Sequence, residues 1–516
     1  MLPEKDLQSR WFSEPLQYLT FSPAAFQTNK AGQPSLTRYH QELICKYMRL
    51  KHAPYFLLCD VGPEVEKDAG SSATIDPSSA TEFPSLAEAA TAQPAKEIKP
   101  KTPEHNSYAA YLRHIERQQE PFSYLEQTTL TNFQDWLQSP LQPLSDNLES
   151  VTYEVFEGDP VKYWQYQQAI TEALRDWSAK GKPTSGPDGA VVIAVAGSGR
   201  GPLVTRALRA SEETGVPVRV WAVEKNPNAY VYLLRQNERA WGGRVTVVKT
   251  DMRAWKGPLV SGSADDGSAV YGTVDILVSE LLGSFGDNEL SPECLDGIQH
   301  VLAPGHGISI PASYTAHLSP IAAPRIHADI RQRASPPSSA STGGGPGGLG
   351  DVTAFDTPWV VQLYAIDFVA AARVPERHRF QQAWEFAHPL PAGTMAAVEA
   401  RRSGGVAGGG GGSMAGGVGA NDHNARHCHL VFVCRERAVV HGLAGYFESV
   451  LYAPEEETGA EAADDDREEG ESRREKVELS TLPDMIGRKS KDMISWFPIF
   501  FPLKVSFLFS FLCGFF

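Results

Sequence analysis

The chain has 516 residues, of which 42% are hydrophobic and 21% are charged, a composition typical of a globular protein with about two to four domains. Its formal net charge is −15, and no basic block is large enough to follow a phosphate backbone. This argues against nucleic acid as the main partner and allows a cationic protein substrate. Six cysteines without a C-x-x-C pair indicate a reducing compartment, the cytosol or nucleus, and no structural zinc site.

The first part of the chain reads as the end of a larger α/β unit. An amphipathic helix is predicted over residues 36–50, and an apolar strand follows over residues 55–59. One such repeat cannot bury both of its faces, so residues 1–61 are expected to be a remnant. Residues 62–107 are rich in Ser, Ala, Thr, Pro and Glu, which is typical of a disordered linker. Residues 108–138 have a helical pattern and are expected to form a helical linker.

Apolar strands then alternate with amphipathic helices, which defines a domain over residues 139–310. Strands are predicted at residues 191–196, 218–223, 245–248 and 274–279, and helices at residues 159–178, 202–214, 227–241 and 292–302. This order predicts a parallel sheet flanked by helices, as in a Rossmann-like α/β fold.

After residue 310 the pattern changes to short segments of period two, which predict an antiparallel β domain over residues 311–504. The segments lie at residues 314–318, 359–364, 429–433 and 443–451. Three low-complexity stretches, at residues 335–350, 404–417 and 455–471, are expected to be surface insertions. Residues 505–516 are apolar but shorter than the roughly 20 residues of a spanning helix, so we expect an aberrant tail and no membrane anchor.

A glycine loop after the first strand of the α/β domain indicates a nucleoside cofactor. Gly197, Gly199 and Gly201 let the backbone approach a ligand, and the following helix offers free N–H groups. Glu224 ends the next strand, where a carboxylate binds ribose hydroxyls in nucleotide-binding sheets. Pro202 replaces the third glycine of the dinucleotide fingerprint, which favours a ligand without a pyrophosphate, commonly S-adenosylmethionine. A tight turn without a ligand is the alternative.

Two further positions complete the candidate site. Asp251 and Met252 follow the third strand, where an adenine would lie, although Asp251 could equally be a helix N-cap. Glu280 stands at the end of the fourth strand, and Glu289 closes the loop after it. The two carboxylates could be an acid/base pair or a metal site, but no His accompanies them, so we predict no metal. A guanidinium would fit them, and a surface loop with ordinary charges is the alternative.

Longer segments of the chain resemble the type II protein arginine N-methyltransferases, the family that makes symmetric dimethylarginine. They are residues 139–144 (SPLQPL), 146–150 (DNLES), 152–157 (TYEVFE), 222–229 (AVEKNPNA), 279–296, 441–448 (HGLAGYFE) and 495–498 (SWFP). The resemblance implies an S-adenosylmethionine-dependent enzyme acting on arginine in histone tails and in Arg-Gly-rich RNA-processing proteins. It also implies a Rossmann-like domain followed by an antiparallel β-barrel domain and preceded by the remnant of a (β/α) barrel.

The resemblance also implies a role for each matching position. Glu280 and Glu289 would be the catalytic pair that clamps the target arginine. The positions that match cofactor-binding residues are Tyr153, Lys162, Tyr163, Gly197, Gly199, Glu224, Asp251 and Met252. The positions that match substrate-binding residues are Phe156, Leu282 and Trp496. Phe156 is associated with the symmetric product and Trp496 with stacking on the guanidinium. From the residues alone, these aromatic side chains would be core residues.

The family also has features that this chain matches only in part. Its complete N-terminal barrel docks a WD-repeat partner and helps to form a homo-oligomer, and the chain resembles only the end of that barrel. We therefore expect a chain truncated at both ends. The cysteine usage described above leads us to expect it in cytoplasm and nucleus. The alternatives to an arginine methyltransferase are a small-molecule methyltransferase and a catalytically inactive scaffold. Two carboxylates with an aromatic lid favour the guanidinium substrate.

Overall fold

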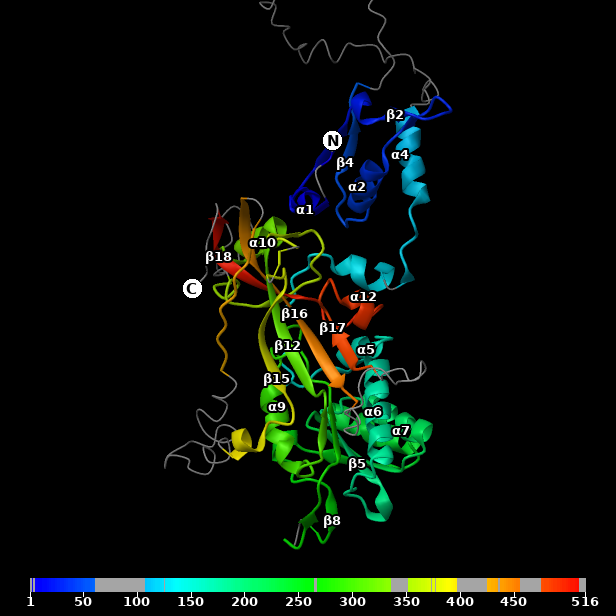
Figure 1. The fold of residues 1–516 in the computed structure, drawn as a ribbon, viewed down its shortest axis with the longest axis vertical. Coiled ribbons are helices and arrows are strands. Elements are labelled where there is room, and N and C mark those ends of the chain that lie inside the picture. The colour runs from blue at the N-terminus through cyan, green and yellow to red at the C-terminus, as the bar shows by residue number, and fades with distance from the viewer. Residues whose placement is uncertain are drawn as a thin grey trace, which may run out of the picture. The chain divides into compact units, whose positions relative to one another are not determined.

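The computed structural model describes residue 2 and residues 5–60, 107–124, 126–263, 267–335, 351–372, 374–375, 377–396, 425–434, 437–454 and 475–509. They form two compact units, which are coloured along the chain in Figure 1. One unit comprises Met1–Gln8 and Pro15–Tyr124, and the other comprises Ser9–Glu14 and Leu125–Phe516. Apart from Ser107 and Ser335, the expected linker over residues 62–107 and the three expected insertions lie outside the described residues.

The first unit pairs two parallel strands, β1 (Tyr18–Phe21) and β4 (Tyr55–Leu58). Helices α2 (Arg38–Met48) and α4 (Ser107–Gln118) pack in the same unit. Its core contains Phe21, Leu36, Ile44, Leu112 and Ile115. The shorter elements of this unit are η1 (Pro23–Ala25), β2 (Gln27–Thr28) and β3 (Pro34–Ser35). Helix α1 (Lys5–Ser13) is divided between the two units after Gln8. Parallel strands with covering helices are what a (β/α) unit requires.

The helix expected over residues 108–138 differs from the prediction. Helix α4 ends at Gln118, shortly before Pro121, because a proline disfavours helical backbone at the residue before it. Leu112 and Ile115 of α4 are buried in the core of the first unit. This helix therefore belongs to the first unit and is not a linker.

The second unit contains a five-stranded parallel sheet in the order β11-β10-β5-β6-β7. Its strands are β5 (Val191–Ala196), β6 (Val218–Glu224), β7 (Val245–Lys249), β10 (Ile276–Ser279) and β11 (Ile308–Ile310). The chain moves outward from β5 through β6 to β7 and then returns to the other side of β5. In such sheets ligands bind where the order reverses, beyond the carboxyl ends of the strands. The predicted Rossmann-like fold is confirmed.

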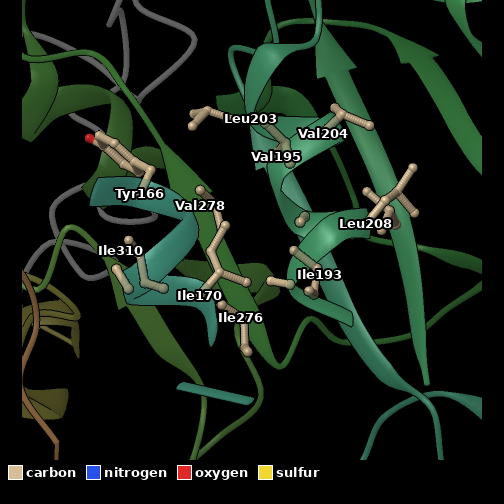
Figure 2. Packing of buried hydrophobic residues seen from close by; sticks show 14 of the residues in the cluster. Tyr166, Ile170, Ile193, Val195, Leu203, Val204, Leu208, Ile276, Val278 and Ile310 are labelled. Carbon is tan, nitrogen blue, oxygen red and sulfur yellow. The ribbon is translucent and has the colours of Figure 1, made fainter. Parts of the chain in front are cut away.

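Helices cover both faces of this sheet. Ile193 and Val195 of β5 pack with α6 (Lys162–Ala179) and α7 (Pro202–Thr214), as Figure 2 shows. Alternate residues of β5 point to the other face and pack with α9 (Ser291–Ile298). Every residue of β5 is buried, which explains its continuous apolar sequence.

A seven-stranded antiparallel sheet follows, with the order β13-β18-β16-β12-β14, and with β15 paired to β12 and β17 to β16. Its strands are β12 (Ser313–Ala322), β13 (Trp359–Val360), β14 (Asp367–Phe368), β15 (Gln381–Ala387), β16 (Ala438–Tyr452), β17 (Val477–Ser480) and β18 (Ile499–Phe509). The predicted antiparallel second domain is confirmed. Strand β18 remains paired with β16 up to Phe509, so regular structure does not end at residue 504 as expected.

The strand expected over residues 429–433 is not formed. The side-chain amide of Gln381 donates to the carbonyl oxygen of Val431 at 2.6 Å and accepts from its N–H at 3.2 Å. A side chain thus occupies backbone groups that a neighbouring strand would otherwise pair, and only an isolated bridge forms at Cys434.

The remaining elements include α8 (Pro227–Arg239), a regular helix as long as α7, and otherwise mostly shorter segments. They are η2 (Glu126–Leu130), η3 (Thr131–Phe133), α5 (Ser150–Glu157), η4 (Pro187–Gly189), α8 (Pro227–Arg239), η5 (Met252–Ala254), β8 (Leu259–Ser261), β9 (Val270–Tyr271), η6 (Gln299–Val301), α10 (Pro324–Ala334) and α12 (Ile486–Lys489). Among the helices in the described part of the chain, none has both the length and the apolar character needed to cross a membrane.

Candidate active site

A cavity of about 490 Å³ lies beyond the carboxyl ends of β5, β6, β7 and β10. All of the predicted site residues line it, although they come from distant parts of the chain. They are Tyr153, Phe156, Lys162, Tyr163, Gly197, Gly199, Glu224, Asp251, Met252, Glu280, Leu282, Glu289 and Trp496. The cavity is therefore the crevice that the strand order places at this edge of the sheet.

The glycine loop after β5 is tied to the end of β6. Gly197 and Gly199 have φ values of +70° and +54°, which favour glycine. One oxygen of Glu224 accepts from the N–H of Gly199 at 2.7 Å, and the other accepts from the N–H of Asn226 at 2.7 Å. Burial raises the pKa of Glu224 despite these donors. A Cβ on Gly199 would lie 2.9 Å from the ring of Tyr153, so the loop also requires glycine there for close packing.

Arg200, in the middle of this loop, binds helix α5. Its guanidinium contacts the carboxylates of Glu154 at 2.6 Å and of Glu157 at 3.2 Å, and it donates to the carbonyl oxygen of Ser150 at 3.2 Å. Helix α5 has no buried residue, so these charged contacts, together with the packing of Tyr153 on the glycine loop and its hydrogen bond from Asn226, hold it against the cavity wall. Sequence reasoning assigned no role to Arg200, because its partners in α5 are 43 or more positions away. Only the place of Arg200 inside the glycine loop indicated a role.

Asp251 has a close cationic partner. Its oxygens accept from the N–H and Nε of Arg253 at 2.9 and 3.0 Å and from a terminal guanidinium nitrogen at 2.8 Å. Burial alone would raise the pKa of Asp251, but the hydrogen bonds from Arg253 hold it below its usual value. Asp251 is also the N-cap of η5, so the alternative considered from the sequence is present in the structure.

The loop that carries the two predicted carboxylates folds back on itself. Gly283 and Gly286 exchange backbone hydrogen bonds of 3.1 and 2.8 Å, and Gly286 has a φ of +84°. The Asn288 side chain accepts from the N–H of Phe285 at 2.7 Å. The Phe285 ring is buried and packs edge-on against Trp384. This turn returns the second carboxylate toward the first.

The two carboxylates differ in their environment. Glu280 forms an ion pair with the Nζ of Lys162 at 3.1 Å. Burial raises the pKa of Glu289 to about 8, helped by the negative charge of Glu280 and opposed by Lys162. Although burial disfavours the charged form of Lys162, the Glu280 carboxylate raises its pKa. At neutral pH the site thus holds one ion pair and one carboxyl that is mostly protonated.

Aromatic rings surround the cationic end of Lys162. Its Nζ lies 5.0 Å from the ring centre of Phe156, 4.8 Å from that of Tyr163 and 4.9 Å from that of Trp496. The Trp496 indole donates to the carbonyl oxygen of Leu282 at 2.6 Å, which fixes the ring beside the carboxylate loop. Rings at these distances stabilise a cation, so this end of the cavity is suited to a positively charged group.

The carboxylate pair and the aromatic wall contain nothing else that suits a metal. In the residues that the structure describes, no group of three or more His, Cys, Asp or Glu is arranged to hold a metal ion.

Three family models match consecutive parts of the chain. They are the PRMT5 TIM barrel domain over residues 1–118, the PRMT5 arginine-N-methyltransferase domain over residues 124–310 and the PRMT5 oligomerisation domain over residues 313–510. Protein arginine N-methyltransferase skb1 of Schizosaccharomyces pombe is 35% identical over 97% of this chain and 61% of that protein. Protein arginine N-methyltransferase 5 of Xenopus laevis is 34% identical over 98% of this chain and 59% of that protein.

Among solved structures, one chain of the Trypanosoma brucei PRMT1 enzyme–prozyme heterotetrameric complex with AdoHcy is similar to this chain. The matched region covers 70% of this chain and 84% of that chain. It is 14% identical with a TM-score of 0.42, a likeness too weak to carry an argument. The parallel sheet, the antiparallel sheet that follows it and the match to an arginine-N-methyltransferase domain define the class of methyltransferase folds to which the chain belongs. Within this class, the chain belongs to the protein arginine N-methyltransferase 5 family. It spans about 60% of the length of these relatives.

Proposed function

We propose that the chain transfers methyl groups from S-adenosylmethionine to the guanidinium nitrogens of arginine in proteins, giving mono- and symmetric dimethylarginine. The observation that carries the proposal is the pairing of Glu280 and Glu289 beside an aromatic wall, in the same cavity as the glycine loop. The relatives that match most of this chain are named arginine N-methyltransferases, which supports the same substrate class.

The cavity fits a nucleoside cofactor at its glycine-loop end. A Cβ on Gly197 would lie 3.1 Å from the side chain of Leu281 and 3.2 Å from that of Met252, closer than most Cβ contacts, so glycine leaves more room there for a ligand. Glu224 would hold the ribose hydroxyls, and Asp251 and Met252 would hold the adenine. Tyr153, Lys162, Tyr163 and Gly199 are the other proposed cofactor contacts. When bound, S-adenosylmethionine supplies an electrophilic methyl group on a sulfonium.

The two carboxyl groups would bind and orient the substrate guanidinium. A guanidinium is always charged and matches carboxylates bidentately, so its arrival favours the ionised form of Glu289. Glu280 and Glu289 then hold one guanidinium nitrogen toward the methyl donor, which supplies orientation and electrostatic stabilisation. Phe156, Leu282 and Trp496 would form the apolar sides of the arginine pocket. Methylation releases one proton, which the Glu289 carboxylate, ionised in the complex, could accept.

The proposal is tested by incubating the chain with methyl-labelled S-adenosylmethionine and an Arg-Gly-rich peptide. We expect label on arginine, and we expect Glu289→Gln to lose transfer while retaining cofactor binding. If the wild-type chain binds the cofactor but transfers no methyl group, the proposed enzymatic activity is contradicted and an inactive scaffold is supported. Equal loss of transfer and of cofactor binding in Glu289→Gln would contradict the proposed division of roles.

The physiological partners are proposals as well. We propose histone tails and Arg-Gly-rich proteins as substrates, because a flexible cationic segment suits an acidic chain. We propose a homo-oligomer, which the match to an oligomerisation domain supports, and a WD-repeat partner only for a longer chain with a complete barrel. The proposed location is cytoplasm and nucleus, since the five cysteines in the described part of the chain are free.

A further inference from the structure

A buried carboxylate outside the predicted site joins two distant segments of the cavity wall. Asp159 lies between α5 and α6 and is 4% exposed. One of its oxygens accepts from the N–H groups of Val161 at 2.7 Å and Lys162 at 2.9 Å. The other oxygen accepts from the N–H groups of Ile494 at 3.1 Å and Ser495 at 2.7 Å. A side chain that only capped a helix would use the first pair of contacts and not the second.

The two segments that Asp159 joins carry two of the three rings of the aromatic wall, Tyr163 and Trp496. Lys162 and Tyr163 begin α6, and Trp496 follows directly after Ser495. Trp496 has a φ of +64°, which is strained for a bulky side chain and requires support from its surroundings. The hydrogen bonds to Asp159 hold the backbone immediately before it, and the indole hydrogen bond to Leu282 holds its ring. The ring centre then lies 4.9 Å from the Lys162 Nζ.

We propose that Asp159 is a positioning residue for the arginine pocket, which sets the spacing between the Trp496 turn and the start of α6. The inference rests on the proposed function, because it assigns the wall to the substrate cation. Only an ionised carboxylate offers two acceptor oxygens to two pairs of N–H donors. An amide of the same shape would turn its NH₂ group toward one pair and release that segment.

Asp159→Asn is the direct test, with Asp275→Asn as its matched control. Asp275 is also buried. One of its oxygens accepts from the N–H groups of Ser185 at 2.9 Å and Val192 at 2.8 Å, and the other accepts from the Ser185 hydroxyl at 2.6 Å. Asp275 does not line the cavity, so Asp275→Asn reports the cost of replacing a buried, hydrogen-bonded Asp away from the cavity wall. The measurement is the Kd of a fluorescein-labelled Arg-Gly-rich peptide, by anisotropy in the presence of S-adenosylhomocysteine, with the Kd of S-adenosylhomocysteine measured separately.

We expect Asp159→Asn to weaken peptide binding about tenfold or more, as losing hydrogen bonds to a charged group does. S-adenosylhomocysteine binding should weaken by a clearly smaller factor, because only the start of α6, with Lys162 and Tyr163, belongs to the proposed cofactor contacts. Asp275→Asn should leave both affinities unchanged. In a Trp496→Phe background the effect of Asp159→Asn should shrink, because the two residues act through one contact. Equal effects of Asp159→Asn and Asp275→Asn, or full additivity with Trp496→Phe, would overturn the inference.

Binding and transfer distinguish this inference from the proposed function. If the wild-type chain binds the peptide without methylating it, the proposed reaction is contradicted. The Kd comparison between the wild type and Asp159→Asn would still test the positioning role of Asp159. An unchanged chain that binds no arginine peptide would overturn the inference as well, because no arginine pocket would exist to be positioned.

Discussion

Raising the pH from 6 to 9 is expected to strengthen binding of an arginine peptide through ionisation of Glu289. Its pKa of about 8 arises first from burial and then from the charge of Glu280. The carboxyl is therefore ionised in about one molecule in a hundred at pH 6 and about one in ten at pH 7. Because the guanidinium binds the ionised form, the apparent affinity scales with that fraction. The Kd should fall about ninefold between pH 6 and 7 and about fivefold between pH 7 and 8, and then level off.

The assay is anisotropy of a labelled Arg-Gly-rich peptide between pH 6 and 9 at constant ionic strength, since salt screens charge interactions. Glu289→Gln should bind weakly and show no rise of affinity through pH 8. Asp287 is a control in the same loop, because burial raises its pKa to only about 6. Asp287→Asn should leave the rise between pH 7 and 8 in place. A wild-type Kd that is constant from pH 6 to 8, or a rise that persists in Glu289→Gln, would refute the reasoning.

Three further outcomes are expected. Arg200→Ala should weaken S-adenosylmethionine binding about tenfold in equilibrium dialysis, because its charged contacts hold α5 in place; unchanged affinity would show that α5 needs no such anchor. Gly199→Ala should cost about 1–3 kcal/mol in urea unfolding, since its φ is positive and its Cβ would meet Tyr153; a stable variant would argue against that packing. Glu289→Gln should be more stable than the wild type at pH 8 but not at pH 4. The folded-state pKa is raised, so the wild type loses about 1.4 kcal/mol per pH unit as pH rises from 4.5 toward 8; a pH-independent difference would contradict this.

The periodic elements of the α/β domain could be predicted from the sequence, because a buried parallel strand is apolar throughout and its helices are amphipathic. The wholly buried β5 and the glycine loop after it are the clearest case. Glu224 and Glu280 were found because strand ends in such sheets face the ligand. Period-two segments were less reliable: residues 429–433 have the pattern of a strand, but the Gln381 side chain binds the backbone at Val431.

Contacts between distant segments could not be predicted in this way. Nothing local shows that Arg200 holds α5, that Lys162 pairs with Glu280, or that Asp159 reaches the backbone at residues 494–495. The aromatic side chains of Tyr153, Phe156 and Trp496 have the composition of core residues, and only the family resemblance assigned them to the site. Their environment depends on where the fold brings β10 and the segment before β18 together. The roles assigned to individual site residues remain predictions.

The most direct test of the account is mass spectrometry of an Arg-Gly-rich peptide after incubation of the chain with S-adenosylmethionine. The account predicts monomethylarginine first and symmetric dimethylarginine later, with neither product from Glu280→Gln or Glu289→Gln. An unmodified peptide in the presence of folded, cofactor-binding chain would contradict the proposed activity. Asymmetric dimethylarginine would contradict the role proposed for Phe156.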